Sequence, residues 1–337
     1  GASRPWNYRN KMQFPVGRQK NQVVIGCYAM GSHAIVDTHN CLIQEEANNT
    51  IANIVREVAQ KFSVPVYDEK AHKGVLRHVV GRIAEEGVMV VLVTATPVLP
   101  HAHELINELR ARIPNLVSVM QSINKRQTNM ILGDVTKHLW GKSTIIAKLG
   151  DLNFHISARS FFQVNTKQAE VLYNKALEYA GLTGKETVID AYCGTGTISL
   201  FLAKKAKTVI GIEIVDAAIH DAKKNAIDNQ VKNAEFIVGD ATQVMPELYK
   251  DGVRPDVIVV DPPRVAGGLQ PVQQVLQAGL VDVAVETLPQ HLIEQVGNLI
   301  AAVAAVVGDL LQVQLRVKVG ALSLKVVLQV LGHGGEL

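Results

Sequence analysis

The turn Asp190-Ala191-Tyr192-Cys193-Gly194-Thr195-Gly196-Thr197 decides the fold of the second half of this chain. It follows the apolar run Thr187–Ala191, which is typical of a buried strand, and it opens a helical pattern that continues to Ala206. Glycines at a junction of this kind let the backbone approach a nucleotide closely. The stretch therefore predicts a strand, a nucleotide-binding turn and a helix.

Strands and helices alternate on both sides of this turn. The helical patterns are Gln168–Ala180 and Ala217–Asn229, and the further strands are Val209–Ile214, Ala234–Val238 and Val257–Val260. This alternation predicts an α/β fold with a doubly wound, Rossmann-like sheet. Ligands bind such sheets beyond the carboxyl ends of the strands. Polar residues lie at the ends of four successive predicted strands: Tyr192, Glu213, Asp240 and Asp261.

Glu213 favours an adenosine ligand at this edge. It lies nineteen residues after Gly194, where a carboxylate can accept both hydroxyls of a ribose. Ser199 stands where a dinucleotide-binding fold has its third glycine, and no basic cluster awaits a pyrophosphate. S-adenosylmethionine, which carries no phosphate, therefore fits better than NAD. The plain alternative is a tight turn with Glu213 facing solvent.

The segment Asp261-Pro262-Pro263-Arg264 follows another predicted strand. Two prolines can neither continue a ladder nor begin a helix interior, so they predict a rigid shelf beside the cofactor crevice. In methyltransferases a shelf of this type cradles a planar base. A plain turn is the alternative.

The first half lacks this regular alternation and reads as an α+β recognition module. Helices are predicted over 51–62 and 101–112. Strands are predicted over Val75–Val80, Val88–Thr94, Val117–Met120, Met130–Leu132 and Thr144–Ala147. We expect a central domain over 1–157 and a methyltransferase-like domain over 158–337. Residues 265–337 are atypical because they contain no aromatic residue and no cysteine.

The first twenty residues carry five basic side chains and no acidic one. Aromatic residues, Trp6, Tyr8 and Phe14, lie between the basic ones, and that mixture is typical of RNA contact because cations meet phosphates and rings stack on bases. A solvated terminal arm is the alternative.

Composition excludes several other classes of protein. A chain of 337 residues that is 47% hydrophobic and 19% charged is globular, with room for two domains. Its longest uncharged apolar run, 299–308, is about half of what a bilayer requires. Cys27, Cys41 and Cys193 lie far apart, so neither a disulfide framework nor a metal cluster is predicted, and a reducing cytoplasm fits. We expect a monomer that does not bind membranes.

Five separated motifs together resemble the RNA uracil-C5 methyltransferase family, over about residues 5–264. In chain order they are Tyr8-Arg9-Asn10-Lys11 with Phe14-Pro15-Val16-Gly17, Leu76-Arg77-His78-Val79-Val80, Ser160-Phe161-Phe162-Gln163-Val164-Asn165, the 190–197 turn and the 261–264 shelf. The resemblance is nearest to bacterial enzymes that methylate 23S ribosomal RNA to 5-methyluridine. The branch that acts on the tRNA T-loop shares the catalytic motifs.

The resemblance implies roles for individual residues. The S-adenosylmethionine site would be lined by Gln163, Tyr192, Gly194, Glu213, Asp240 and Asp261. Asp261 would also lie at the edge shared with the target base. RNA would be bound by Arg9, Lys11, Arg18, Arg77 and Arg264.

Two expected groups have no match. The family's nucleophilic cysteine lies in a Ser-Cys-Asn-Pro motif after the shelf and its base is a glutamate near the C-terminus, but this sequence contains neither motif. Uracil C5 is a weak nucleophile until a thiolate adds to C6, so the covalent route has no identified donor, and we expect Cys193 to pack beneath its turn. A catalytically inactive RNA-binding protein is therefore an alternative. An amino-directed methyltransferase is disfavoured, since Arg264 follows the prolines where such sites usually have an aromatic residue.

Overall fold

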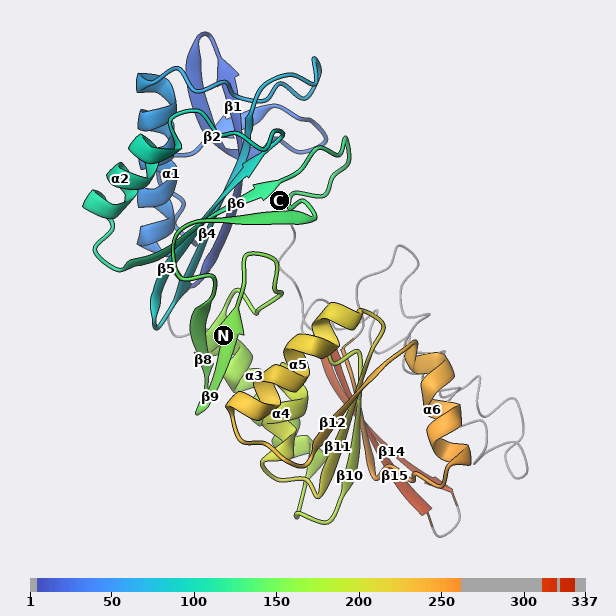
Figure 1. The fold of residues 1–337 in the computed structure, drawn as a ribbon. Coiled ribbons are helices and arrows are strands. Elements are labelled where there is room, and N and C mark those ends of the chain that lie inside the picture. Colours follow the sequence, from blue (N-terminus) through green and yellow to red (C-terminus); the bar gives the residue numbers. More distant parts are fainter. Residues whose placement is uncertain (1–4, 262–310, 320–321, 331–337) are drawn as a thin grey trace. The chain divides into compact units, whose positions relative to one another are not determined.

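The computed structural model describes residues 5–261, 311–319 and 322–330, the last two ranges as backbone strands (Figure 1). Residues 1–169 form one compact unit and residues 170–336 a second. Helix α3 (Thr166–Ala180) crosses this division. The domain limits of 1–157 and 158–337 stay a prediction.

The first unit is built on a seven-stranded sheet in the order β3-β2-β1-β4-β5-β6-β7. Its strands are β1 (Lys11–Gln19), β2 (Gln22–Tyr28), β3 (Ile35–Asp37), β4 (Leu76–Ala84), β5 (Gly87–Thr94), β6 (Leu116–Ile123) and β7 (Val135–Gly141). Neighbours are antiparallel except β5 and β6, which are parallel and joined through α2 (Ala102–Arg112). A separate hairpin consists of β8 (Ile145–Leu149) and β9 (Leu152–Ile156).

Helices α1 (Glu46–Lys61) and α2 cover one face of this sheet (Figure 1). The periodic residues of α1 that predicted a helix, Ile51, Ile54, Val55 and Val58, are buried in the core with strand residues such as Val79 and Val90. Burying such side chains contributes about 1.5–3 kcal/mol each. Both predicted helices of this half are confirmed.

Two predictions for this half are wrong. Residues 11–19 form β1, which pairs with both β2 and β4, so this segment is no terminal arm. Phe14 is only 3% exposed, and its ring cannot stack on RNA bases. Residues 130–132 lie in the loop before β7 and not in a strand.

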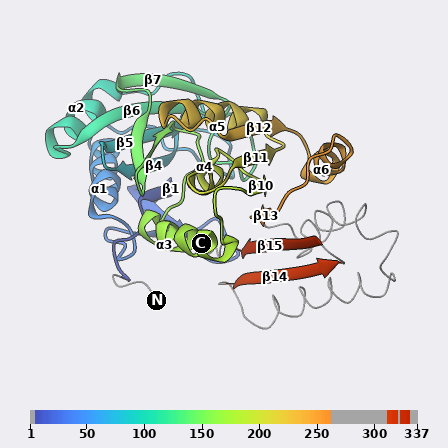
Figure 2. The ribbon, with the colours of Figure 1, turned by 90° about the horizontal axis from the view of Figure 1, so that it is seen from below.

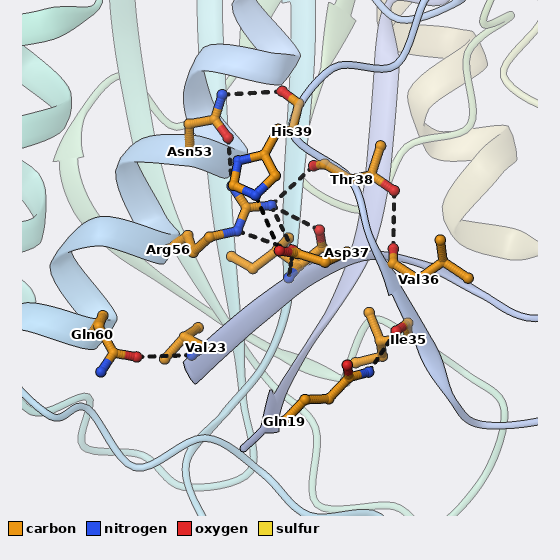
Figure 3. Close-up of polar contacts among 11 residues, drawn as sticks. Gln19, Val23, Ile35, Val36, Asp37, Thr38, His39, Asn53, Arg56 and Gln60 are labelled. Carbon is orange, nitrogen blue, oxygen red and sulfur yellow. Dashed lines mark hydrogen bonds and ion pairs between the residues drawn. The ribbon is translucent and has the colours of Figure 1, made fainter. Parts of the chain in front are cut away.

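Arg56 of α1 clamps the segment that follows β2 (Figure 3). Its Nε donates to Asp37 Oδ1 at 3.1 Å, and its Nη2 donates to the carbonyl oxygens of Ile25 and Thr38 at 2.9 Å each. His39 binds the same Asp37 carboxylate at 3.1 Å. These groups satisfy one another and backbone carbonyls, so the cluster holds β3 against the helix.

The second unit contains the predicted doubly wound sheet, in the order β12-β11-β10-β13-β15-β14. Its elements are β10 (Thr187–Ala191), α4 (Thr197–Ala203), β11 (Thr208–Glu213), α5 (Asp216–Asp228), β12 (Ala234–Val238), α6 (Ala241–Lys250), β13 (Val257–Val260), β14 (Leu311–Val319) and β15 (Leu322–Val330). Only β14 runs antiparallel to its neighbour (Figure 2). The α/β, Rossmann-like prediction is confirmed.

Both faces of this sheet are covered. Met245 of α6 packs with Ile210 and Ile258 on one face, while α4 and α5 lie on the other (Figure 1). Helix α6 was not predicted, because Pro246 interrupts its pattern. No helix among the described residues is long and apolar enough to cross a membrane.

Candidate active site

The four polar residues predicted at strand ends lie along one edge of the second sheet. Strands β12, β11, β10 and β13 are adjacent and parallel, so their carboxyl ends meet at the same edge. Asp240 follows β12, Glu213 ends β11, Tyr192 follows β10 and Asp261 follows β13. The central prediction about the placement of these four residues therefore agrees with the structure.

The turn after β10 has an unusual backbone. Tyr192 has φ +109°, which a residue with a Cβ rarely adopts, and Gly194 and Gly196 have φ +54° and +79°. The N–H groups of Tyr192 and Cys193 both donate to the carbonyl oxygen of Ile212, at 2.9 Å each. These bonds to β11 hold the strained turn in place, and such strain is often stored at functional sites.

The two glycines meet different surroundings. A Cβ at Gly196 would lie 3.0 Å from the ring of Phe236, so the turn packs tightly on the sheet there. A Cβ at Gly194 would meet no atom within 4 Å. The backbone at Gly194 therefore borders open space, which is what a ligand that approaches the backbone requires.

Glu213 anchors this turn through its carboxylate. Its Oε2 accepts from the N–H of Gly194 at 3.2 Å, and its Oε1 accepts from the N–H of Val215 at 3.0 Å. A carboxylate has about four acceptor sites, so capacity remains for ribose hydroxyls. Burial raises the pKa of Tyr192, and the charges of Asp240 and Glu213 raise it further.

Asp240 has a clear structural role as well. Its Oδ1 accepts from the backbone N–H of Thr242 at 2.8 Å and from that residue's hydroxyl at 2.7 Å, which caps the start of α6. The loops at this edge, 192–197, 214–217 and 239–241, contain no lysine or arginine. This part of the edge offers carboxylate acceptors for hydroxyl groups and no cationic side chain for a phosphate, which fits S-adenosylmethionine.

Asp190 lies directly beneath the turn and was not singled out from the sequence. It is fully buried, and its Oδ2 accepts from the hydroxyl of Ser199 at 2.6 Å, while Oδ1 has no hydrogen-bond partner among the described residues. Burial raises the pKa of Asp190 to about 6, against the Ser199 hydrogen bonds, which lower it. An aspartate inside an apolar strand was the available sequence signal.

Asp190 predicts a pH dependence of stability. Its carboxyl pKa rises from 3.8 to about 6 on folding, so its contribution is complete below about pH 4 and is lost as the pH rises to 6. This pKa difference corresponds to about 3 kcal/mol in the free energy of unfolding. We expect Asp190→Asn to remove this loss, measured by urea unfolding at pH 4 and pH 7. Parallel profiles for the parent and the variant would contradict this role, and the exposed Asp251→Asn serves as the control.

Cys193 faces away from open space. It is 5% exposed. Its Sγ packs so closely on Gly211 that a Cβ added to that glycine would lie 2.9 Å from the sulfur. Burial raises the pKa of this thiol, and the charges of Asp190 and Glu213 raise it further. Because only the thiolate attacks, this environment disfavours a nucleophile and agrees with the packing role expected for Cys193.

The other predicted site residues lie in the first unit or outside the described residues. The carbonyl oxygen of Gln163 accepts from Asn10 Nδ2 at 3.1 Å. Arg9 donates to the carbonyl of Lys11 in β1 at 3.0 Å, and the exposed Arg18 donates to the carbonyl of Asn21 at 2.9 Å. Arg264 lies outside the described residues.

Arg77 is placed differently from what direct RNA contact requires. Its side chain is 2% exposed and ion-pairs with Glu69 at 3.2 Å. The guanidinium also donates to two backbone carbonyls and lies over the ring of Tyr67. A guanidinium buried in this way, with both Nη atoms bound to groups of the protein, holds loop structure and is not placed to meet a phosphate.

Comparisons with known proteins agree with this geometry. A family model described as a methyltransferase domain matches residues 182–310. Proteins named uncharacterized RNA methyltransferases are 53% identical in Clostridium tetani and 52% identical in Halalkalibacterium halodurans, each over 266 residues, which are 78% of this chain. The chain spans 58% of the length of these relatives.

A solved structure is similar over most of the chain. The tRNA (uracil-54, C5)-methyltransferase of Pyrococcus abyssi, in complex with S-adenosyl-L-homocysteine, matches with a TM-score of 0.66 and 27% identity. The match covers 82% of this chain and 64% of the other. Together with the named RNA methyltransferases, this likeness shows that the chain belongs to the RNA uracil methyltransferase family.

Proposed function

We propose that this chain carries the cofactor site and RNA-binding parts of an S-adenosylmethionine-dependent methyltransferase that acts on uridine C5. The observation that carries the proposal is the edge formed by Tyr192, Glu213 and Asp240, with open space over Gly194. Such an edge suits an uncharged adenosine. S-adenosylmethionine supplies a methyl group on a positively charged sulfur.

Each residue at the edge would have its own task. The Glu213 carboxylate would accept the ribose hydroxyls, because its two oxygens keep acceptor capacity beyond the Gly194 and Val215 N–H groups. Tyr192 and Asp240 would border the adenosine. Gln163 and Asp261 are proposed to line the same cofactor, with Asp261 at the edge of the target base.

The proposed substrate is uridine in 23S ribosomal RNA, methylated to 5-methyluridine by a monomer in the cytoplasm. Support for ribosomal RNA comes from the motifs of residues 5–264, which resemble that branch most closely. A tRNA substrate is the second candidate, because the Pyrococcus abyssi enzyme is named as a tRNA methyltransferase.

Covalent catalysis requires a thiol that the described site does not supply. Cys193 is buried with a raised pKa, and Cys27 and Cys41 pack against the core of the first unit. A chain of this sequence therefore suits binding of cofactor and RNA better than completion of methyl transfer. This property keeps the inactive RNA-binding protein as the alternative function.

Calorimetry tests the cofactor assignment. S-adenosylmethionine and S-adenosylhomocysteine should bind the chain, while NAD should bind much more weakly because its pyrophosphate would meet carboxylates and no lysine or arginine in the loops 192–197, 214–217 and 239–241. Gel-shift titrations with 23S ribosomal RNA fragments and tRNA T-loops then separate the two substrates. Equal affinity for NAD, or tighter binding of the T-loop, would overturn the corresponding part of the proposal.

A further inference from the structure

Two loops leave the same edge of the first sheet. Loop 68–74 precedes β4 and loop 124–134 follows β6 (Figure 1). Strand β5 lies between β4 and β6, and its Thr94 pairs with both Leu76 and Ile123. The first residue of β4 and the last residue of β6 therefore lie at the same end of these neighbouring strands, and the two loops leave the sheet there together.

Arg77 joins the two loops from beneath. Its Nη1 donates to the carbonyl oxygens of Asn124 at 2.9 Å and Arg126 at 2.7 Å, while its Nη2 pairs with Glu69 Oε1 at 3.2 Å. One planar guanidinium thus binds groups of both loops in fixed directions, which lysine could not do. These bonds connect the two loops through a single side chain.

The acidic groups of these loops are already engaged. Asp68 accepts from the backbone N–H groups of Lys70 at 2.8 Å and Ala71 at 3.0 Å, and these bonds lower its pKa. Glu69 is held by Arg77, and Asp134 pairs with Arg126 at 2.5 Å. Asp68 keeps its negative charge near Lys70, but the two loops and Arg77 together carry five lysine and arginine side chains against three carboxylates.

Three exposed lysines remain without an ion pair among the described residues: Lys70, Lys73 and Lys125. They come from both loops, and the exposed Met130 lies in the second loop. Lysine is depleted in protein–protein interfaces but is a usual partner of nucleic-acid phosphates. The surface therefore suits a polyanionic strand better than an acidic protein.

We propose that loops 68–74 and 124–134 form one phosphate-binding surface for an RNA strand, with Arg77 as its positioning residue. The inference rests on the proposed function, since it takes RNA as the substrate. It assigns contact to Lys70, Lys73 and Lys125, and it gives Arg77 the task of keeping the two loops in register. The ordered loops bind without having to be arranged first, which preserves affinity.

The direct test is the triple variant Lys70→Ala, Lys73→Ala, Lys125→Ala. The logarithm of the affinity for single-stranded RNA falls with the logarithm of the salt concentration, with a slope of about 0.7 per phosphate contact. The slope of the triple variant should therefore be smaller by about 2. At about 0.1 M salt its affinity should fall by at least about tenfold. The matched control replaces three exposed lysines of the second unit, Lys205, Lys207 and Lys232, and should keep the parent's slope.

Arg77→Met tests the positioning role, because it removes no exposed charge. Hydrogen exchange should become faster in both loops at once, RNA affinity should fall, and Arg77→Lys should not restore it. Faster exchange with unchanged RNA affinity would overturn the positioning role. If Arg77→Met does not fold, the lysine variant still decides the surface.

The outcomes separate this inference from the proposed function. If the parent binds no RNA, the proposed function fails. If the parent binds RNA and the triple variant keeps both its affinity and its salt slope, only the surface is wrong. Poly-glutamate that competes as well as RNA at equal charge would assign the surface to an acidic protein instead.

Discussion

RNA that contains 5-fluorouridine should form no covalent adduct with a chain of this sequence. Fluorine at C5 cannot leave as the C5 proton does, so a thiolate that adds to C6 stays attached to the RNA. The sequence offers three cysteines, and none follows the 261–264 shelf. Intact-mass measurement should give the protein's own 36.6 kDa alone, with and without the fluorinated RNA.

The environments of the cysteines explain this result. Cys193 is 5% exposed beneath its turn, and burial together with Asp190 and Glu213 raises the pKa of its thiol. Burial also raises the pKa of Cys27, which packs against the core of the first unit. A family enzyme that has the Ser-Cys-Asn-Pro motif is the positive control. An adduct whose peptide maps to Cys27, Cys41 or Cys193 would contradict our interpretation of all three.

Strands β10, β11 and β13 of the second sheet were predictable because they are buried on both faces. Such strands appear as short continuous apolar runs, and the limits of β10 and β13 agree with the predicted ranges, as do those of the less buried β12. The position of the candidate site followed from the general rule that ligands bind at the carboxyl ends of parallel strands. In this sheet the local sequence pattern and the tertiary structure therefore agree on where the strands and the candidate site lie.

The first unit was harder to predict because its contacts join distant parts of the chain. Strand β1 contains Lys11, Arg18 and Pro15, and the sequence pattern predicts no strand there. Pro15 lies where β1 changes from pairing with β4 to pairing with β2, a place where the missing N–H can be tolerated. No local pattern reveals such an exchange of partners.

Arg77 shows the same limit for a single side chain. Its basic charge and its place in a motif suggested RNA contact, whereas its partners are carbonyls of Asn124 and Arg126, far along the chain. The buried Asp190 is a similar case, because its role depends on Ser199 in the next helix. The residue type alone does not show whether a charge meets solvent or the interior.

Glu213→Ala should weaken S-adenosylmethionine binding at least about tenfold. Hydrogen bonds to a charged group contribute about 1.5–3 kcal/mol each, and about 1.4 kcal/mol corresponds to a factor of ten in affinity. The variant also loses the bonds that hold Gly194 and Val215, so the turn itself should loosen. Calorimetry measures the affinity, and a thermal unfolding scan reports the structural part.

Glu213→Gln removes part of each contribution. The amide keeps one oxygen but replaces the other acceptor with a donor, so one of the N–H groups of Gly194 and Val215 and one ribose hydroxyl should lose their partner. We expect both the affinity and the melting temperature to lie between those of the parent and Glu213→Ala. Glu235→Ala, an exposed change on neighbouring β12, should leave both quantities unaltered. If Glu213→Ala instead lowers the melting temperature but leaves the affinity unchanged, Glu213 only fastens the turn and the ribose must be bound by other residues.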